Sequence, residues 1–328
     1  MKFLLSLLLL LLLAAGVVAY VVSTPYGPST ETFVDIAPRT GASAIAAQME
    51  KAGIIRSRYG FALLRLQKPG TLKAGEYRFD HPVTMPEVYA RLIQGDVYTQ
   101  ALTIPEGYNI FDIAAAVEAA GFAKRDEFLA AERQHTELIA QWVPPSTHPA
   151  SLEGYLFPDT YRLSRHATPL QILTVMTHRF RQATVQLGLA ETQNIPQTVI
   201  MASLIEKEVG VADERPLVAG VFINRLARSM PLATDPTVIY AALLDGRWRG
   251  TIYASDLKSP SPYNTYKHPG LPPGPICNPG IAALRAALHP AQTDYLYFVS
   301  DAAGHTRFSV DLKEHAAQVQ AYRQSEKH

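Results

Sequence analysis

The first hydrophobic segment of the chain is continuous, because residues Phe3 to Val22 carry no charged side chain. About 20 apolar residues at about 1.5 Å each match the ~30 Å hydrocarbon core of a bilayer, so we predict a transmembrane helix over residues 1–22. A cleaved signal peptide is the alternative, but the apolar run is longer than the ~7–15 residues of a signal core. Lys2 is the only positively charged side chain before Arg39, which predicts a cytoplasmic N-terminus with the rest of the chain outside.

After this segment the pattern changes to short elements. Residues 23–31 are rich in Pro, Ser, Gly and Thr, which indicates a tether. Periodicity over residues 32–100 then predicts a strand at Phe33–Ile36, helices at Ala42–Gly53 and Ser57–Gln67, and a strand at Leu72–Phe79. This β-α-α-β order is the ground plan of a small wall-binding module, and we expect a LysM-like module here.

The remainder of the chain, residues 101–325, is dominated by helical patterns. Loops are indicated at Trp142–Ala150 and along the Gly/Pro-rich stretch Lys258–Gly280. The predicted elements are helices at Pro169–Leu187, Pro196–Val209, Pro216–Ala227 and Ile281–Leu288, and a strand at Tyr295–Ser300. Many helices with few strands predict a helix-rich α+β domain.

The composition and net charge limit the classes of protein to which this chain can belong. The 328 residues are 48% hydrophobic and 18% charged, which indicates a globular chain long enough to bury a cleft. The net charge is +1, so nothing favours nucleic acid, whose binding usually needs a basic face. The one cysteine, Cys277, cannot form an intramolecular disulfide. Together with His268, His305 and His315 it lacks the short spacing of zinc ligands, so we expect neither a metal site nor a cofactor.

The helix predicted at Pro196–Val209 places an acid in apolar surroundings. Pro196 suits a first helical turn, and apolar residues then cover the helix nearly all the way round, which is typical of a buried helix. At about 100° per residue, Glu206 and Glu208 point about 200° apart and are not a pair on one face. The residues that share a face with Glu206 are Val199, Ala202, Ser203, Val209 and Gly210.

A carboxyl at position 206 has two reasons to keep its proton near neutral pH. Burial disfavours the anion, and the negative end of the helix dipole repels it. A protonated carboxyl is what general-acid cleavage of a glycosidic bond needs. The residues alone leave a second interpretation open, in which Glu206 forms a buried ion pair with Lys207, Arg215 or Arg225.

Six motifs follow one another in the second half of the chain. They are Ser203–Glu208 (SLIEKE), Val221–Leu226 (VFINRL), Thr234–Tyr240 (TDPTVIY), Tyr263–Tyr266 (YNTY), Gly270–Ile276 (GLPPGPI) and Asn278–Gly280 (NPG). With Leu152–Tyr161 (LEGYLFPDTY) upstream and Tyr295–Val299, Gly304-His305 and Glu314-His315 downstream, they resemble the endolytic murein transglycosylase family, also called YceG-like. The resemblance covers essentially the whole chain, including the anchor and the front module.

The resemblance implies a lytic transglycosylase that cuts the bond between N-acetylmuramic acid and N-acetylglucosamine within nascent glycan strands. The implied product is a 1,6-anhydro end, and the implied acid/base is Glu206, the first glutamate of the Glu-Lys-Glu run. Because the sugar's own 6-hydroxyl would attack, one carboxyl would suffice where ordinary glycosidases need two. The implied location is the cell inner membrane with a periplasmic catalytic domain, and the implied partners are peptidoglycan strands, the membrane and peptidoglycan synthases.

Other motif residues are expected to shape a substrate-binding cleft. They are Glu153, Ser203, Asn224, Asp235, Thr237, Tyr263, Asn264 and Tyr266. The tyrosines either stack on sugar faces or are simply buried, and Asp235 is either a group behind the site or a helix N-cap. Glu153 is the leading candidate for a second carboxylate near the cleft, or else a surface residue at the start of a strand. Ala233 stands where relatives commonly have Gln, which puts a ligand contact from that position in doubt.

Two other functions stay open. A hydrolytic muramidase would use water placed by Glu153 or Asp235, and its product ends would be heavier by one water than anhydro ends. A non-catalytic wall-binding scaffold would recruit synthases through the front module and the anchor, and it would bind strands without making any product.

Overall fold

The computed structural model describes residues 2–143, 150–189, 194–300 and 305–325. Most of the loop predicted at Trp142–Ala150 therefore lies outside the described residues. The chain forms two compact units, one of Met1–Gln100 with Arg162–Arg165 and one of Ala101–Tyr161 with His166–His328. We call them unit 1 and unit 2.

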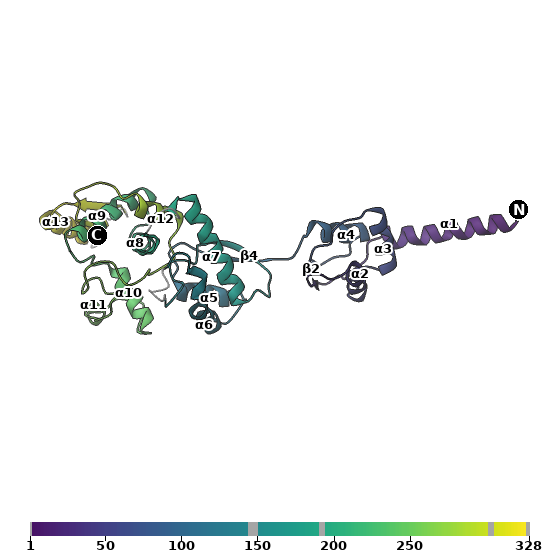
Figure 1. Ribbon diagram of the computed structural model, residues 1–328, viewed down its shortest axis with the longest axis horizontal. Coiled ribbons are helices and arrows are strands. Elements are labelled where there is room, and N and C mark those ends of the chain that lie inside the picture. The colour runs from purple at the N-terminus through teal and green to yellow at the C-terminus, as the bar shows by residue number, and fades with distance from the viewer. Residues whose placement is uncertain (1, 144–149, 190–193, 301–304, 326–328) are drawn as a thin grey trace. The chain divides into compact units, whose positions relative to one another are not determined.

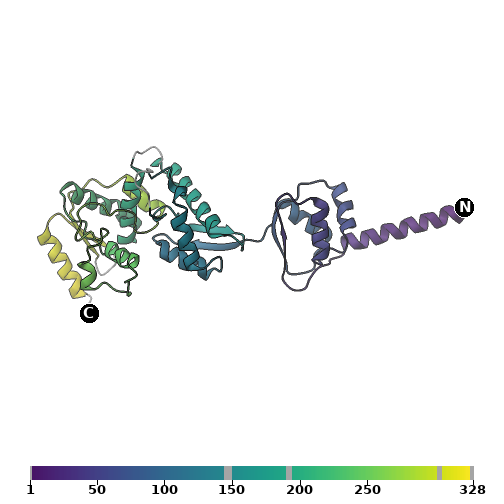
Figure 2. The ribbon, with the colours of Figure 1, turned by 60° about the horizontal axis from the view of Figure 1, so that its bottom comes forward.

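Unit 1 begins with the apolar helix α1 (Lys2–Ser23). Over Phe3–Ser23 this helix is long and apolar enough to cross a membrane, and none of that stretch is buried. In Figures 1 and 2 it leaves the folded part of unit 1 as one continuous helix. Val21 and Val22, near its end, pack against the core of the unit, so the last turn of α1 belongs to the fold of unit 1.

The rest of unit 1 has the predicted strand, helix, helix, strand order. The elements are β1 (Thr32–Ile36), α2 (Ala42–Lys51), α3 (Arg58–Gln67) and β2 (Gly75–Phe79), followed by α4 (Met85–Gln94). β1 and β2 pair antiparallel with Val34 opposite Tyr77, and both side chains enter the core. The sequence prediction missed α4, although Thr84 and Glu87 form a capping box at its start and Gly95 ends it with φ 71°. The LysM likeness of this unit stays a prediction.

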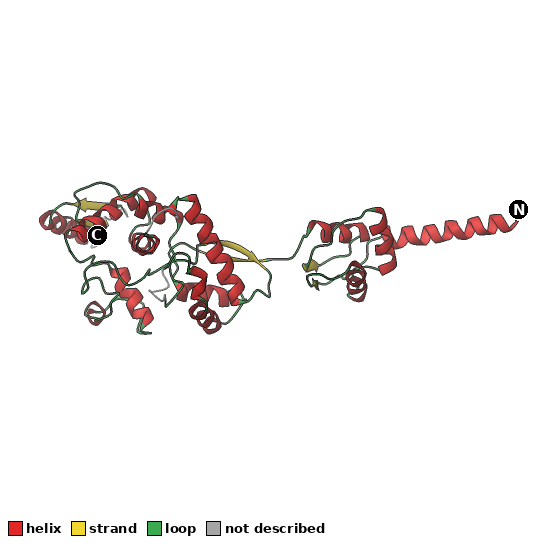
Figure 3. Ribbon diagram, viewed as in Figure 1, coloured by secondary structure: helices red, strands yellow, loops and turns green. Residues whose placement is uncertain are grey.

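Unit 2 consists mainly of helices, with short two-stranded sheets (Figure 3). Its first elements are β3 (Gln100–Ile104), α5 (Ile110–Ala119), α6 (Arg125–Gln134), η1 (Thr136–Ile139), β4 (Asp159–Leu163) and α7 (Pro169–Gln186). They are followed by α8 (Ile195–Glu208), η4 (Ala212–Glu214), α9 (Arg215–Ala227), α10 (Asp235–Leu244), α11 (Ala254–Leu257), α12 (Ile281–Leu288), β5 (Tyr297–Ser300), β6 (Thr306–Ser309) and α13 (Leu312–Ser325). The predicted α+β class is confirmed.

Helix α8 lies inside unit 2, where it contacts α9, α10 and α12 (Figure 1). The prediction of a buried helix is confirmed, because the side chains of Val199, Ala202, Leu204 and Ile205 have no exposed surface. Burying apolar residues on every face fixes α8 against its neighbours, so its last turn is held in a defined place. That last turn carries Glu206.

Candidate active site

Glu206 accepts hydrogen bonds on both oxygens of its carboxylate. Arg215 Nη2 donates to Oε1 at 2.9 Å, and the backbone N–H of Gly280 donates to Oε2 at 2.9 Å. Arg215 begins α9 and Gly280 is the N-cap of α12, so three helices meet at one carboxylate. The Glu206 side chain is only 5% exposed.

The contact with Arg215 is one of the ion pairs that the sequence left open. Glu206 therefore does not lie in the purely apolar pocket that the helix pattern predicts, because η4 turns the chain back and brings Arg215 onto it. The Arg215 side chain is 9% exposed, and its Nε has no hydrogen-bond partner among the described residues. A buried guanidinium of this kind depends on its carboxylate for charge balance.

Glu106 is a second carboxyl at this place, and the sequence prediction missed it. It lies in the turn before α5, within Pro105-Glu106-Gly107. Its carboxyl fills the space beside Gly280, since a Cβ on Gly280 would lie 1.9 Å from Glu106 Oε1. Burial raises the pKa of Glu106, the charge of Glu206 raises it further, and Arg215 acts in the opposite direction. The resemblance to a one-carboxyl family gave no reason to look for it.

Asn278 and Glu153 fix the loops on which Glu106 and Gly280 lie. Asn278 Nδ2 donates to Glu153 Oε1 at 2.7 Å and to Tyr108 O at 3.0 Å, and its Oδ1 accepts from Leu156 N at 2.8 Å. Glu153 Oε2 accepts from Ile110 N at 3.0 Å, at the start of α5. Glu153 is 3% exposed, and burial raises its pKa to about 8. It is neither a surface residue nor the start of β4, and it lies behind the site.

Three of the expected cleft residues lie inside unit 2 and bond to its backbone. Ser203 Oγ accepts from Ile276 N at 3.1 Å, which ties α8 to the segment before Asn278. Thr237 Oγ1 donates to Thr234 O at 2.7 Å, and Asn264 Nδ2 donates to Ser259 O at 2.8 Å. None of these three side chains has exposed surface, so in this structure they support the loops and do not line a cleft.

The other expected residues are placed differently. Asn224 Nδ2 donates to Thr293 O at 2.7 Å and to Tyr295 O at 3.0 Å, which ties α9 to the segment before β5. The ring of Tyr263 packs at 5.1 Å against the buried Tyr240, and burial raises the Tyr263 pKa to about 12. Tyr263 therefore fits the buried alternative better than sugar contact.

Tyr266 and Asp235 are the two exposed residues among those expected to shape the cleft. Tyr266 is 40% exposed, and its hydroxyl donates to Asp235 Oδ1 at 2.7 Å. Thr234 occupies the N-cap of α10, so the N-cap expectation for Asp235 is wrong and this residue is the first of the helix. Asp235 also helps to raise the pKa of Glu208 to about 7, after the larger effect of burial. Glu208 thus faces a different set of groups from Glu206, as the helical spacing predicts.

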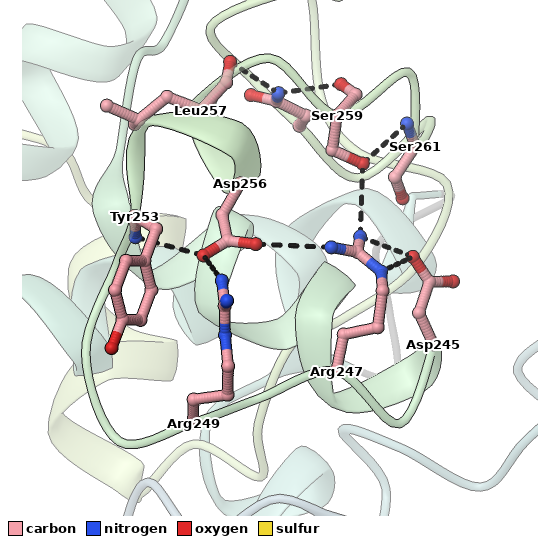
Figure 4. Close-up of polar contacts among 9 residues, drawn as sticks. Asp245, Arg247, Arg249, Tyr253, Asp256, Leu257, Ser259 and Ser261 are labelled. Atoms are coloured by element: carbon pink, nitrogen blue, oxygen red, sulfur yellow. Dashed lines mark hydrogen bonds and ion pairs between the residues drawn. The ribbon is translucent and has the colours of Figure 1, made fainter.

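A polar cluster fixes the loop that leads into the Tyr263–Tyr266 motif (Figure 4). Asp256 lies between Arg247 and Arg249, with nitrogen to oxygen distances of 3.1 and 3.2 Å, and it accepts from Tyr253 N at 2.9 Å. Arg247 is also paired with Asp245 at 2.7 Å. The arginine charges are compensated within the cluster, which indicates a structural role.

Two relatives, one crystal structure and one family profile all indicate the same protein family. An endolytic murein transglycosylase of Bacillus subtilis (strain 168) is 32% identical over 309 residues, which are 89% of this chain and 85% of the relative. One from Streptococcus pneumoniae (strain ATCC BAA-255 / R6) is 29% identical over 90% of this chain, and the match spans 59% of that longer protein. The crystal structure of a YceG-like protein from Listeria monocytogenes is 32% identical with a TM-score of 0.60, covering 88% of this chain and 99% of that one. The profile of the YceG-like family matches residues 34–321, so the chain belongs to the YceG-like family.

Proposed function

We propose that this protein is an endolytic murein transglycosylase that cuts glycan strands of peptidoglycan, with Glu206 as its acid/base carboxyl. Membership of the family and the names of the relatives support the activity. The observation that carries the proposal is the geometry of Glu206, a nearly covered carboxylate held by Arg215 and Gly280 within the Ser203–Glu208 motif. Fixed donors of this kind hold a reacting carboxyl in one orientation.

The proposed reaction uses no water. In the first step, a carboxyl of the site donates a proton to the glycosidic oxygen. At the same time, the bond from that oxygen to C1 of N-acetylmuramic acid breaks. The 6-hydroxyl oxygen of the same sugar then bonds to C1, and its proton returns to the site. One proton leaves and one comes back, and the products are a free 4-hydroxyl and a 1,6-anhydro end. Because the attacking group belongs to the substrate, the second step has the advantage of an intramolecular reaction.

The remaining parts of the chain are suited to holding the catalytic unit close to the cell wall. We propose that α1 is a retained anchor in the inner membrane, with its N-terminus in the cytoplasm and unit 2 in the periplasm. Unit 1 would hold the wall as a LysM-like module, and peptidoglycan synthases making nascent strands would be its partners. Cleavage within such strands would end their elongation.

The test is digestion of purified glycan strands with the full chain in detergent, followed by mass spectrometry of the products. The proposal expects anhydro ends from the natural sequence and their loss in Glu206→Gln. Glu208→Gln on the same helix is the matched control, and we expect it to retain cleavage. Ends heavier by one water would select hydrolysis instead, and strand binding without any product would select the scaffold function.

A further inference from the structure

The first step of the proposed reaction donates a proton and the second step takes one back. Both oxygens of the Glu206 carboxyl already accept hydrogen bonds, from Arg215 Nη2 and from the backbone N–H of Gly280. The first step needs a proton in the same place. Because each Glu206 oxygen already faces an N–H donor, a second carboxyl beside it would offer a free oxygen for that proton.

Glu106 lies beside Glu206, because its carboxyl occupies the space at Gly280, whose N–H donates to Glu206. Glu106 is more exposed than Glu206, so it is within reach of a substrate. The described residues donate no hydrogen bond to its carboxyl, and the charged groups that act on it are Glu206 from α8 and Arg215 from α9. Lys207 contacts the adjacent backbone instead, because its Nζ donates to Gly107 O at 3.3 Å.

Gly280 brings the two carboxyls together. Its N–H donates to Glu206, and the Glu106 carboxyl occupies the space where a side chain at position 280 would lie. The backbone of Gly280, at φ −78° and ψ 176°, is open to any residue, so conformation does not require glycine here. The missing side chain is what lets Glu106 approach the Glu206 site.

We propose that Glu106 is a second functional carboxyl of this site, and that it holds the proton that the first step donates. The inference rests on the proposed function and adds a residue to it. The raised pKa of Glu106 agrees with this assignment. The pair gives one proton to the glycosidic oxygen and regains one from the 6-hydroxyl, so it ends the reaction as it began.

The first test compares Glu106→Gln with Glu206→Gln in the strand-cleavage assay. Gln keeps the size of the side chain beside Gly280 and removes the titrating group, so we expect a loss of about 100-fold or more. Glu106→Asp should retain part of the rate, because the proton remains available. The control is Glu118→Gln on α5, an exposed side chain of the same unit, which should cleave at the natural rate.

The pH profile separates a proton-holding role from a structural one. If Glu106 holds the donated proton, loss of that proton sets the alkaline limb of the natural enzyme, and burial and the charge of Glu206 place this limb at higher pH than for an ordinary carboxyl. In Glu106→Gln this titrating group is absent, so the alkaline limb of the residual activity should move. If Glu106 were only structural, Glu106→Gln would change the cleavage rate but leave the pH of the alkaline limb unchanged.

The second test moves Glu106 without deleting it. Gly280→Ala keeps the N–H donor to Glu206 but puts a methyl group where the Glu106 carboxyl lies, so we expect a loss close to that of Glu106→Gln. In a Glu106→Ala background the same change should cost little more, because the displaced side chain is already absent. Thermal unfolding of each variant checks that the fold is kept.

The outcomes separate the two proposals. Loss of cleavage in Glu206→Gln with a natural rate and pH profile in Glu106→Gln would refute the role of Glu106 and leave the proposed function standing. Natural rates in both variants would remove this place as the reacting site. Additive losses in the Gly280→Ala cycle would also refute the inference, since they would mean that Gly280 acts independently of Glu106.

Discussion

Asn278 and Glu153 form a buried hydrogen bond of 2.7 Å that joins two segments 125 residues apart. The same Asn278 side chain holds Tyr108 and Leu156 through their backbone groups. Glu106 lies two residues before Tyr108, and Gly280 lies two residues after Asn278. The Asn278 side chain therefore helps to hold together the segments that carry Glu106 and Gly280, beside the backbone bonds from Gly107 N to Asn278 O and from Asn278 N to Tyr108 O.

Asn278→Ala should destabilise unit 2 strongly. It leaves the Leu156 N–H without its acceptor and takes a donor from Glu153, whereas the Tyr108 carbonyl keeps its bond from the backbone N–H of residue 278. Each unpaired buried group costs about 1–3 kcal/mol. We expect a loss of about 3 kcal/mol in the free energy of unfolding, measured by urea denaturation. A change below about 0.5 kcal/mol would mean that these groups find other partners and that Asn278 does not fix the loops.

Glu153 should make stability depend on pH. Its pKa is raised from the ordinary 4.5 to about 8 in the folded protein, so the folded state binds more protons between these values. The resulting stabilisation is complete below about pH 4.5 and is lost as the pH rises toward 8, with a slope of at most about 1.4 kcal/mol per unit.

Glu153→Gln removes this titration. The variant should be less stable at pH 5, because Ile110 N and Asn278 Nδ2 donate to different oxygens of Glu153 and the amide nitrogen of Gln cannot accept, and the difference should narrow toward pH 8. Subtracting the two curves of unfolding free energy against pH cancels the other titrating groups. Parallel curves would show that Glu153 does not ionise in this range.

The sequence predicted those parts of the fold that local chemistry decides. Helix α12 was predicted at its observed bounds, and α8 within one residue, because Pro and Gly mark their starts and apolar residues fill their faces. The separate directions of Glu206 and Glu208 follow from helical spacing alone. The place of Glu153 was not predictable, since burial of a carboxyl depends on partners far away in the chain.

Only part of the candidate site could be predicted from the sequence, because the rest depends on partners far away in the chain. Glu206 was found through its motif and its helix. Its contacts with Glu106 and Gly280 come from segments 100 and 74 residues away in the sequence, and no local pattern encodes them. Nothing in the Pro105-Glu106-Gly107 sequence indicates that this turn lies against the last turn of α8.

The Glu206–Arg215 pair should show coupled effects on stability. Arg215→Gln leaves a nearly buried carboxylate without its counter-charge, which costs about 3–5 kcal/mol. Glu206→Gln in the same chain removes that charge, so the double variant should be more stable than Arg215→Gln alone. Urea unfolding of the four proteins measures the coupling. If the losses simply add, the ion pair contributes nothing beyond its two separate side chains.

Tyr266 should act on substrate binding and leave the chemistry nearly unchanged. Tyr266 is an exposed residue at the end of the Tyr263–Tyr266 motif, whereas its hydroxyl is already bonded to Asp235. Tyr266→Ala removes the stacking face, and a loss of about 1.4 kcal/mol of binding corresponds to a tenfold rise in KM with kcat nearly constant.

Tyr266→Phe keeps that face and should stay within about threefold of the natural KM, because only the bond to Asp235 is lost. Tyr253→Ala provides the matched control, since Tyr253 is a comparably exposed tyrosine of unit 2 outside the motif. Its removal should leave KM unchanged. Equal rises in KM for the alanine variants of Tyr266 and Tyr253 would mean that loss of any surface ring is enough, and Tyr266 would then have no specific contact with the sugar.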